Sequence, residues 1–239
     1  MTKKVINQNS KLDKEFLNTI KSQFIFANKV INRFDFITTN DGSDKNAKND
    51  LLNNLKNQLN SIENCKLKEN SSKLVFGRGN INSPLMLIGE APGIEEEKSG
   101  IPFQGEVGEL LNKMLQAINI RIKDIYISYT VNFRPPKDRK PTPTELKRYS
   151  VFLKEHISII GPKIIILMGS SAMEAVTGKS EKISSERGKW NEVILKNKTY
   201  PLMITFNPSY LIRFPENKRF SWADLKEIRK KIDELNIKL

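Results

Sequence analysis

The sequence predicts a three-layer α/β/α sandwich with a mainly parallel central sheet. From about residue 73 onward, short apolar runs typical of buried strands alternate with segments whose apolar residues recur at helical spacing. Strands that alternate with helices usually form a parallel sheet with helices on both faces. The chain has 239 residues, of which 38% are hydrophobic, and this is enough for one sizeable core.

Residues 1–63 have a different pattern and are predicted to form a helical extension and linker, separate from the α/β domain of residues 64–239. Apolar residues recur at helical spacing over 12–31 and again over about 49–63. Residues 39–50 (TNDGSDKNAKND) have the composition of a linker. The two helices are expected to pack on the main domain or on a partner.

The α/β domain is predicted to alternate strands and helices along its whole length. Strands are expected at KLVFG (73–77), PLMLIGE (84–90), DIYISYTV (124–131), PKIIILMG (162–169) and twice within 191–206. Helices are expected over 107–118, 143–160, 170–177 before Gly178, and from Ser221 onward. The helix 143–160 has the clearest start, because Thr142 is a good N-cap, Pro143 suits its first position and Glu145 completes a capping box.

Three unusual loops follow predicted strands, at 89–105, 132–142 and 206–219. In parallel sheets, ligands bind at the carboxyl ends of the strands. The sequence therefore predicts that these loops form the functional site.

The composition favours a polyanionic partner. The net charge is +13, and lysine and arginine that neutralise phosphates release counterions, so the charge favours a nucleic acid as partner. The alternative is a diffuse lysine excess that forms no binding face. No G-x-x-x-x-G-K-[ST] motif occurs, so no nucleotide cofactor is expected.

Single residues limit the possible chemistry. One cysteine, Cys65, and one histidine, His156, exclude an internal disulfide, an all-cysteine metal site and catalysis by several imidazoles. His156 falls in the predicted helix 143–160 and is interpreted as a surface or helix-face residue. The sequence has no run of 18 apolar residues and no secretory signal, so we expect a cytoplasmic, monomeric protein without a membrane segment.

The loop 89–105 (GEAPGIEEEKSGIPFQG) combines glycines and prolines with four glutamates. Glycine lets backbone amides approach an anion or a planar ring closely. Because no carboxylate cluster occurs elsewhere, we expect the glutamates to act on water or a developing cation and not on a metal. Phe103 either anchors this loop to the core or stacks on a flat ligand.

Five motifs in this order resemble those of the uracil-DNA glycosylase superfamily, most nearly family 4, whose members usually carry an iron–sulfur cluster. The motifs are GEAPGIEEEKSGIPFQGEVGELLNKML (89–115), YISYTVNFRPPKDRKPTPTEL (126–146), ILMGSSAMEAV (166–176), RGKW (187–190) and NPSYLIR (207–213). The resemblance covers about residues 62–232.

The resemblance implies roles for single residues. Glu90 lies beside the pocket, Glu96 positions the hydrolytic water, and Asn207 lies at the leaving-group position. The base pocket would be formed by Gly89, Ala91, Phe103 and Tyr129, with Phe103 stacking on a base that has left the helix. Contacts to DNA would come from Arg134, Arg139, Ser209 and Arg213.

The chain departs from the family pattern at three places. The four cluster positions hold Ile62, Cys65, Phe133 and Tyr149, and one thiolate cannot hold a four-iron cluster, so no cofactor is expected. We expect that volume to be repacked, with Cys65 as a small buried hydrophobe.

The other two departures fall on the chemistry. Tyr129 replaces the asparagine that reads the edge of uracil, and a single phenol cannot make that bidentate pair. Tyr129 is expected either to fill part of the pocket or to rotate into the packing of the sheet. Asn207 replaces the histidine that stabilises charge on the departing base, which an amide can still do, more weakly.

Three hypotheses follow. The first is a DNA repair glycosylase that flips uracil out of DNA and hydrolyses its N-glycosidic bond. The second is a DNA-binding relative with weakened or lost catalysis, and the third is a glycosylase for another altered base. Glu90, Glu96 and Phe103 favour an enzyme, whereas Tyr129 and Asn207 favour the other two.

Overall fold

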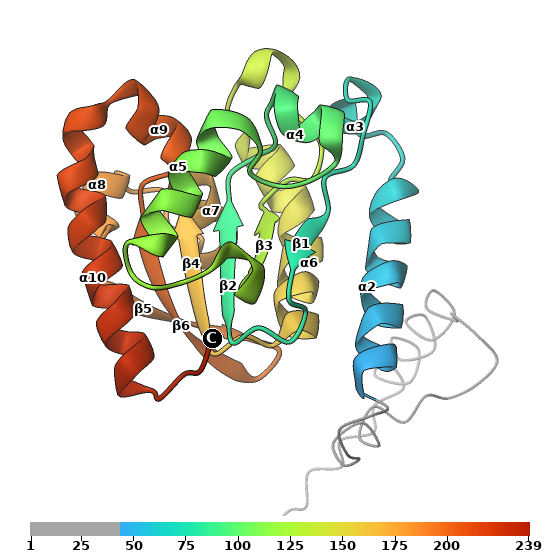
Figure 1. Cartoon of the computed structure of the whole chain (residues 1–239). Helices are drawn as coiled ribbons and strands as arrows, with labels where there is room; N and C mark the ends of the chain where they lie inside the picture. Colours follow the sequence, from blue (N-terminus) through green and yellow to red (C-terminus); the bar gives the residue numbers. More distant parts are fainter. Residues whose placement is uncertain (1–43) are drawn as a thin grey trace, which may run out of the picture. The chain divides into compact units, whose positions relative to one another are not determined.

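A six-stranded sheet forms the centre of the computed structural model, which describes residues 44–239 (Figure 1). The strands are β1 (Gly77–Gly79), β2 (Leu85–Gly89), β3 (Tyr126–Tyr129), β4 (Ile164–Met168), β5 (Trp190–Leu195) and β6 (Lys198–Thr205). Their order is β1-β3-β2-β4-β6-β5. The four inner strands are parallel, and only the edge strands β1 and β5 are antiparallel to their neighbours. The predicted fold class is confirmed.

Alternate residues of the inner strands belong to two different cores. In β2, Met86 and Ile88 pack into the core beneath α6 (Pro143–Ile160) and α7 (Ser170–Thr177). Leu85 and Leu87 pack into the opposite core, beneath α5 (Gly105–Gln116) and α10 (Lys218–Glu234). A strand with both faces covered must be apolar at every position, which explains the continuous apolar runs in the sequence.

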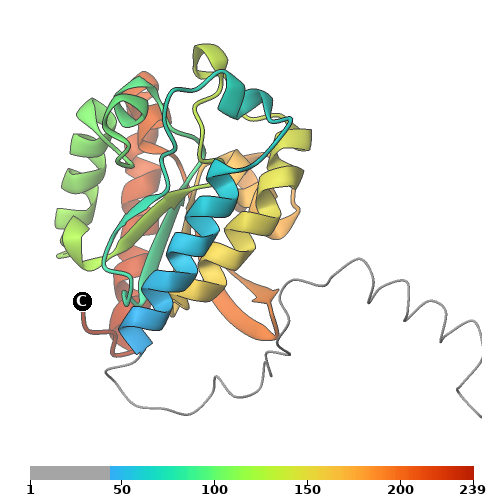
Figure 2. The ribbon, with the colours of Figure 1, turned by 90° about the vertical axis from the view of Figure 1, so that its right-hand side faces the viewer.

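The helix α2 (Asp44–Asn60) lies beside α6, as Figure 2 shows. Its Leu52 and Leu59 belong to the same core as α6. Residues 44–60 therefore belong to the compact unit that extends to Leu239, although the sequence assigns them to a separate extension. The predicted helix 12–31 lies outside the described residues.

The helix α6 begins and ends where the sequence predicts. Glu145 N donates to Thr142 Oγ1 (3.3 Å), and Thr142 N donates to Glu145 Oε2 (2.8 Å), so both halves of the capping box form. Gly161 ends the helix in the left-handed conformation, with φ of 63°.

Several short elements differ from the prediction. In place of the strand expected at 73–77, β1 begins four residues later and ends two residues later, and α10 begins at Lys218 instead of Ser221. The segments predicted as loops contain two short helices, α4 (Ile94–Ser99) and α9 (Pro208–Arg213). Both lie at the end of the sheet toward which the arrow of β2 points in Figure 1.

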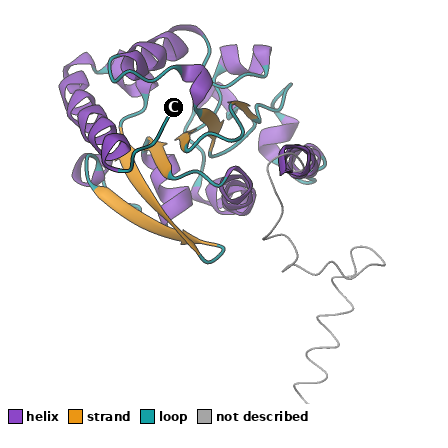
Figure 3. Ribbon diagram, turned by 60° about the horizontal axis from the view of Figure 1, so that its bottom comes forward, coloured by secondary structure: helices purple, strands orange, loops and turns teal. Residues whose placement is uncertain are grey.

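The strands β5 and β6 form a hairpin at one edge of the sheet (Figure 3). Lys196 and Asn197 form its two-residue turn, and both have positive φ, as this kind of turn requires. Within residues 44–239, no helix combines the length and the apolar character needed to cross a membrane.

Candidate active site

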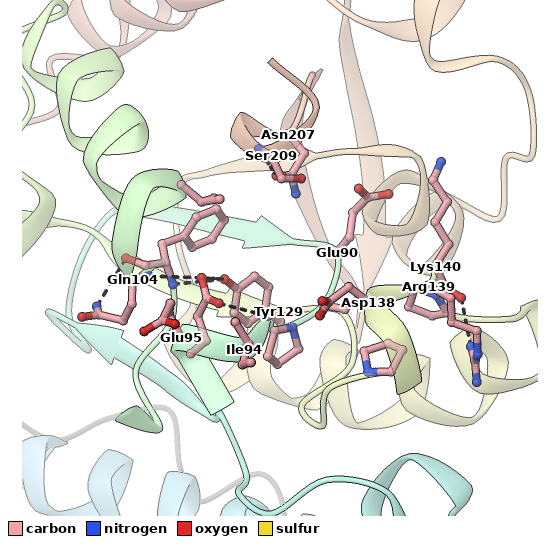
Figure 4. A pocket seen from close by; sticks show the side chains of 18 of the residues that line it. Glu90, Ile94, Glu95, Gln104, Tyr129, Asp138, Arg139, Lys140, Asn207 and Ser209 are labelled. Carbon is pink, nitrogen blue, oxygen red and sulfur yellow. Dashed lines mark hydrogen bonds between the residues drawn. The ribbon is translucent and has the colours of Figure 1, made fainter. Parts of the chain in front are cut away.

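A cleft of about 380 Å³ opens at the carboxyl ends of β2 and β3. The residues around it come from the loop after β2, the loop after β3 and the helix α9. Figure 4 shows Asn207 and Ser209 across the cleft from Tyr129 and Gln104, with Arg139 and Lys140 at one end. The three loops singled out in the sequence thus contribute to one end of the sheet, as parallel strands require.

Glu96 is 5% exposed, and both of its carboxylate oxygens accept hydrogen bonds. Oε2 accepts from Gly93 N (3.0 Å), which ties the carboxylate to the start of α4. Oε1 accepts from Gln104 N (3.1 Å) and from Tyr129 Oη (3.2 Å). The carboxylate therefore holds the acidic loop together and also lines the cleft.

The ring of Phe103 stacks on the ring of Tyr129. The ring centroids are 5.0 Å apart and the planes meet at 23°. Phe103 is 2% exposed and has a left-handed backbone, with φ of 53°. Beneath the pair lies Gly89, where a Cβ would come within 2.7 Å of both rings. Gly89 is therefore needed for the close approach of the two rings, and does not itself line the cleft.

The Tyr129 hydroxyl connects Phe103 with Glu96. It accepts a hydrogen bond from Phe103 N (3.0 Å) and donates one to Glu96 Oε1. Burial, together with the Glu96 charge, raises the pKa of Tyr129 well above its ordinary value, so the hydroxyl keeps its proton and stays a donor. Tyr129 is 3% exposed and belongs to the core that contains Phe103, and it also lines the cleft, so its position combines the two expected ones.

Arg78 is a site residue that the sequence analysis missed. It lies on β1, and its Nη2 donates to Phe103 O (3.1 Å). Its Nε is buried without a partner among the described residues. Burial lowers the pKa of Arg78, while the nearby Tyr129 and Glu96 raise it. The only sequence signal was a basic residue between two glycines, directly after the apolar residues 74–76.

Glu90 is held at the start of α7. Its Oε1 accepts from Ser171 N (3.0 Å) and from Ser170 Oγ (3.3 Å). Gly169, with φ of 108°, leaves room for this carboxylate, because a Cβ there would lie 2.3 Å from Glu90 Cδ. Glu90 and its neighbour Ala91 both line the cleft.

Asn207 is the N-cap of α9. Its Oδ1 accepts from Ser209 N (2.9 Å), and its Nδ2 donates to Met168 O (3.3 Å). The side chain is 6% exposed and lines the cleft together with Ser209. The amide therefore already has a structural partner at each end.

The arginines assigned to DNA differ in how strongly they are engaged. Arg134 bonds Asp138 through Nε (2.7 Å) and Glu97 through Nη1 (3.1 Å), and these bonds raise its pKa; it does not line the cleft. Arg139 makes two bonds to Glu145. Arg213, in contrast, is exposed at the mouth of the cleft and bonds only Ser209 O (3.3 Å) within the described residues.

The residues at the four cluster positions do not fit an iron–sulfur cluster. Cys65 and Tyr149 are buried side by side, with Sγ and Oη 3.3 Å apart. Phe133 lies in the same apolar core, and Ile62 packs against it. One thiol among apolar and aromatic side chains offers a single ligand where four are needed. Within residues 44–239, no group of three His, Cys, Asp or Glu side chains is placed to hold a metal ion.

His156 is not at the surface, and that interpretation was wrong. It is 2% exposed, its Nε2 lies 2.9 Å from Tyr126 Oη, and its ring stacks on Phe76 with centroids 4.4 Å apart. Burial lowers its pKa to about 3, so the imidazole is neutral. The apolar residues of this helix recur at helical spacing, and His156 lies next to them in that pattern. The pattern alone did not show whether the His156 side chain faces the core or the solvent.

The comparisons with known proteins agree with this geometry. A family model described as the uracil DNA glycosylase superfamily matches residues 76–227. The Type-4 uracil-DNA glycosylase of Thermotoga maritima is 39% identical over 155 residues, which are 64% of this chain and 79% of that protein. The one from Archaeoglobus fulgidus is 30% identical over 74% of this chain and 91% of its own length. The one from Sulfurisphaera tokodaii is 32% identical, with 75% and 84% covered. The chain belongs to the uracil-DNA glycosylase superfamily.

Proposed function

We propose that the protein is a DNA repair glycosylase that takes a uracil nucleotide into the cleft and hydrolyses its N-glycosidic bond. The observation that carries this proposal is the arrangement of Glu90, Glu96 and Phe103 around one cleft at the strand ends. The relatives named Type-4 uracil-DNA glycosylases support it, because they match most of the α/β domain.

The proposed reaction is a hydrolysis. The bond between the sugar C1′ and the base nitrogen breaks, and its electron pair leaves with the base. Glu96 stabilises the positive charge that develops on the sugar and orients a water molecule. The water oxygen adds to C1′ and the water loses a proton, while Asn207 Nδ2 donates a hydrogen bond to the departing base anion. The anion takes up the proton, so the products are free uracil and an abasic sugar.

The nitrogen and the oxygen of the Asn207 side-chain amide already have hydrogen-bond partners, and so do both carboxylate oxygens of Glu96. Entry of a base therefore requires a local rearrangement. The Tyr129 ring covers one face of Phe103, which a stacked base would need. The Tyr129 hydroxyl also uses Glu96 Oε1. We therefore propose that Tyr129 sets the substrate range, and that its side chain leaves the Phe103 face when a base enters.

The same contact favours a second candidate, a DNA-binding relative that has lost catalysis. A strand-nicking assay on DNA with uracil, hypoxanthine or xanthine separates the two. Strand cleavage at one of these bases by the wild type, absent in Glu96→Gln, supports the glycosylase. No cleavage at any of them, by protein that binds the same DNA, supports the second candidate.

A double variant tests whether Tyr129 and Asn207 limit uracil excision. Tyr129→Asn restores an edge-reading amide, and Asn207→His restores a stronger donor for the departing base. Together they should increase excision of uracil from single strands more than either change alone, because a poorly held base gains little from a better donor. A folded double variant that is no more active than wild type would support a remodelled or non-catalytic pocket.

We also propose that the protein contains no iron–sulfur cluster and acts as a monomer in the cytoplasm. One thiol at the four cluster positions supports the first part. Purified protein should be colourless and should contain no stoichiometric iron by elemental analysis; a brown protein would contradict this. Sedimentation at micromolar concentration should give the mass of one chain.

A further inference from the structure

A second pocket lies beside the candidate active site. Its volume is about 470 Å³, and its walls come from the start of α7, from α8 (Ile183–Glu186), and from the segment that joins β6 to α10. Lys140 lines both this pocket and the cleft. Lys140 Nζ donates to Ser170 Oγ (2.9 Å), and Ser170 Oγ donates to Glu90 (3.3 Å), so a thin polar wall separates the two cavities.

Aromatic rings line this second pocket and continue beyond it. The rings of Phe206 and Tyr210 have centroids 4.9 Å apart, and Tyr210 and Phe214 are separated by the same distance. Phe220 lines the pocket as well. Phe214 is 45% exposed and Phe220 is 38% exposed. Phe206 is buried and Tyr210 is half-buried, so Phe220 is the exposed ring that lines the pocket. An exposed aromatic ring at a pocket is a feature of binding surfaces.

The charge around these rings suits a phosphate backbone. The guanidinium of Arg187 lies over Phe206 (5.6 Å) and Phe220 (5.3 Å), but its charge is paired with the buried carboxylate of Asp224 and so does not count toward phosphate binding. That of Arg219 also lies over Phe220, at 4.7 Å. Lys140 and Lys182 are exposed on the rim, where Glu181 is the one acidic side chain among the residues that line the pocket. Basic residues interleaved with aromatic rings are the pattern that binds single-stranded nucleic acid.

We propose that this pocket binds the base next to the extruded nucleotide, on a single DNA strand. The proposal rests on the proposed function, because it needs DNA in the neighbouring cleft. A base in a duplex has both faces covered by its neighbours, so only an unstacked base can enter the pocket and lie against Phe220. The ring of Tyr210 already contacts Phe206 and Phe214 and forms the wall beside that base. The pocket therefore favours single-stranded DNA over duplex.

The test uses fluorescence anisotropy with labelled single strands that carry an abasic analogue at the centre. In one strand the two neighbouring nucleotides keep their bases, and in the other they are abasic too. Wild-type protein should bind the first strand roughly 5- to 150-fold more tightly, the range expected for stacking of one base. Equal affinity for the two strands would overturn the proposal without any mutation.

Phe220→Leu should reduce the ratio of the affinities for the two strands severalfold, because leucine keeps the apolar bulk but lacks a ring face. The salt dependence should stay the same, since no phosphate contact is lost. Trp222→Leu is the matched control: Trp222 is 45% exposed on the same helix but lines a different groove, between α5 and α10. If Trp222→Leu reduces the difference as much, or Phe220→Leu not at all, the pocket is not the binding site.

A cross-linking experiment on the wild type avoids any effect of mutation on folding. A single strand with 5-iodouracil beside the abasic analogue should cross-link to Tyr210 or Phe220 on irradiation, as peptide mass spectrometry would show. Cross-links confined to other segments would overturn the proposal. If the affinity difference and the cross-links are found but the nicking assay shows no cleavage, only the proposed catalysis is contradicted. If the nicking assay shows cleavage but neither the affinity difference nor the cross-links are found, only this inference is contradicted.

Discussion

The side chain of Tyr129 occupies the two groups to which the proposed reaction assigns the base and the water. Its ring stacks on Phe103, and its hydroxyl bonds the carboxylate of Glu96. A single substitution at the end of β3 thus affects base stacking and the carboxylate at once. The effects of substitutions at Tyr129 and Glu96 should therefore not be additive.

Glu96→Gln should reduce excision at least about a hundredfold, because an amide stabilises a developing cation poorly. Affinity for DNA should stay within a few-fold of wild type. The variant also loses one acceptor for the three donors around the side chain, which should lower the free energy of unfolding by about 1–2 kcal/mol. Single-turnover kinetics, anisotropy and urea unfolding measure the three quantities.

Glu109→Gln is the control for that variant, because Glu109 is an exposed carboxylate on α5 that does not line the cleft. It should excise at the wild-type rate. Full activity in Glu96→Gln would mean that the carboxylate only holds the loop.

The buried His156 should make stability depend on pH. Its pKa is lowered from 6.5 in the unfolded chain to about 3 in the folded protein. Between these values the unfolded chain binds a proton that the folded protein does not, so stability falls as the pH decreases through this window. The contribution is up to about 1.4 kcal/mol per pH unit.

His156→Gln removes the titratable imidazole and keeps a side chain that can form a hydrogen bond with Tyr126. Between pH 4 and 6.5, the unfolding free energy of the variant should therefore change less steeply with pH than that of wild type. Urea unfolding at several pH values gives both slopes. Parallel slopes would show that His156 is accessible to protons in the folded protein.

At the scale of the element, α9 depends on its N-cap. Asn207→Ser keeps an oxygen that can accept from Ser209 N, whereas Asn207→Ala does not. The alanine variant should therefore lose about 1 kcal/mol of stability, and the serine variant less. Both variants lack the amide donor, so both should lose excision to a similar degree. A serine variant with the wild-type rate would show that Asn207 only caps the helix.

Long elements were predictable from sequence because their signals are local. The capping box of Thr142 and Glu145, and the apolar runs of β2 and β4, depend on a few neighbouring residues. The short helix α4 was not predictable, since distant bonds hold it: Glu97 Oε1 accepts from Ser72 N (2.7 Å), and Glu97 Oε2 from Arg134 (3.1 Å).

The candidate site was predictable in part for the same reason. Motif order placed Glu90, Glu96, Phe103 and Asn207 at one end of the sheet, and the structure places all four around the cleft. The contact of Arg78 with Phe103 joins residues on separate elements, so no local pattern contains it. The sequence left two positions open for Tyr129, in the pocket or in the packing of the sheet, and its stacking on Phe103 over Gly89 is a contact that neither expectation contained.

At the scale of the whole molecule, the positive charge at the strand-end loops is partly neutralised. Of the basic residues there, Arg134 and Arg139 bond carboxylates. The others are exposed and form no ion pair within residues 44–239; they are Lys137, Lys140, Arg213, Lys218 and Arg219. Affinity for DNA should therefore depend mainly on these five.

Replacing Arg213 and Arg219 by glutamate should weaken DNA binding. The slope of the logarithm of the binding constant against the logarithm of the salt concentration should become shallower by about 0.9 for each phosphate contact that is lost. The matched control is Lys123→Glu with Lys163→Glu, which makes the same charge change just before β3 and β4, at the opposite end of the parallel strands. Titrations at several salt concentrations measure both. Equal effects of the two double variants would mean that net charge alone drives binding.

The ion pair between Arg187 and Asp224 restricts how this sequence can change through evolution. Asp224 is 1% exposed, accepts hydrogen bonds from Arg187 and Thr205, and lies 37 positions from its arginine. Loss of either charge alone leaves the other buried without its partner, at a cost of about 3–5 kcal/mol, whereas joint replacement by apolar residues can be neutral. In descendants of this gene, the two positions should therefore keep their charges together or lose them together.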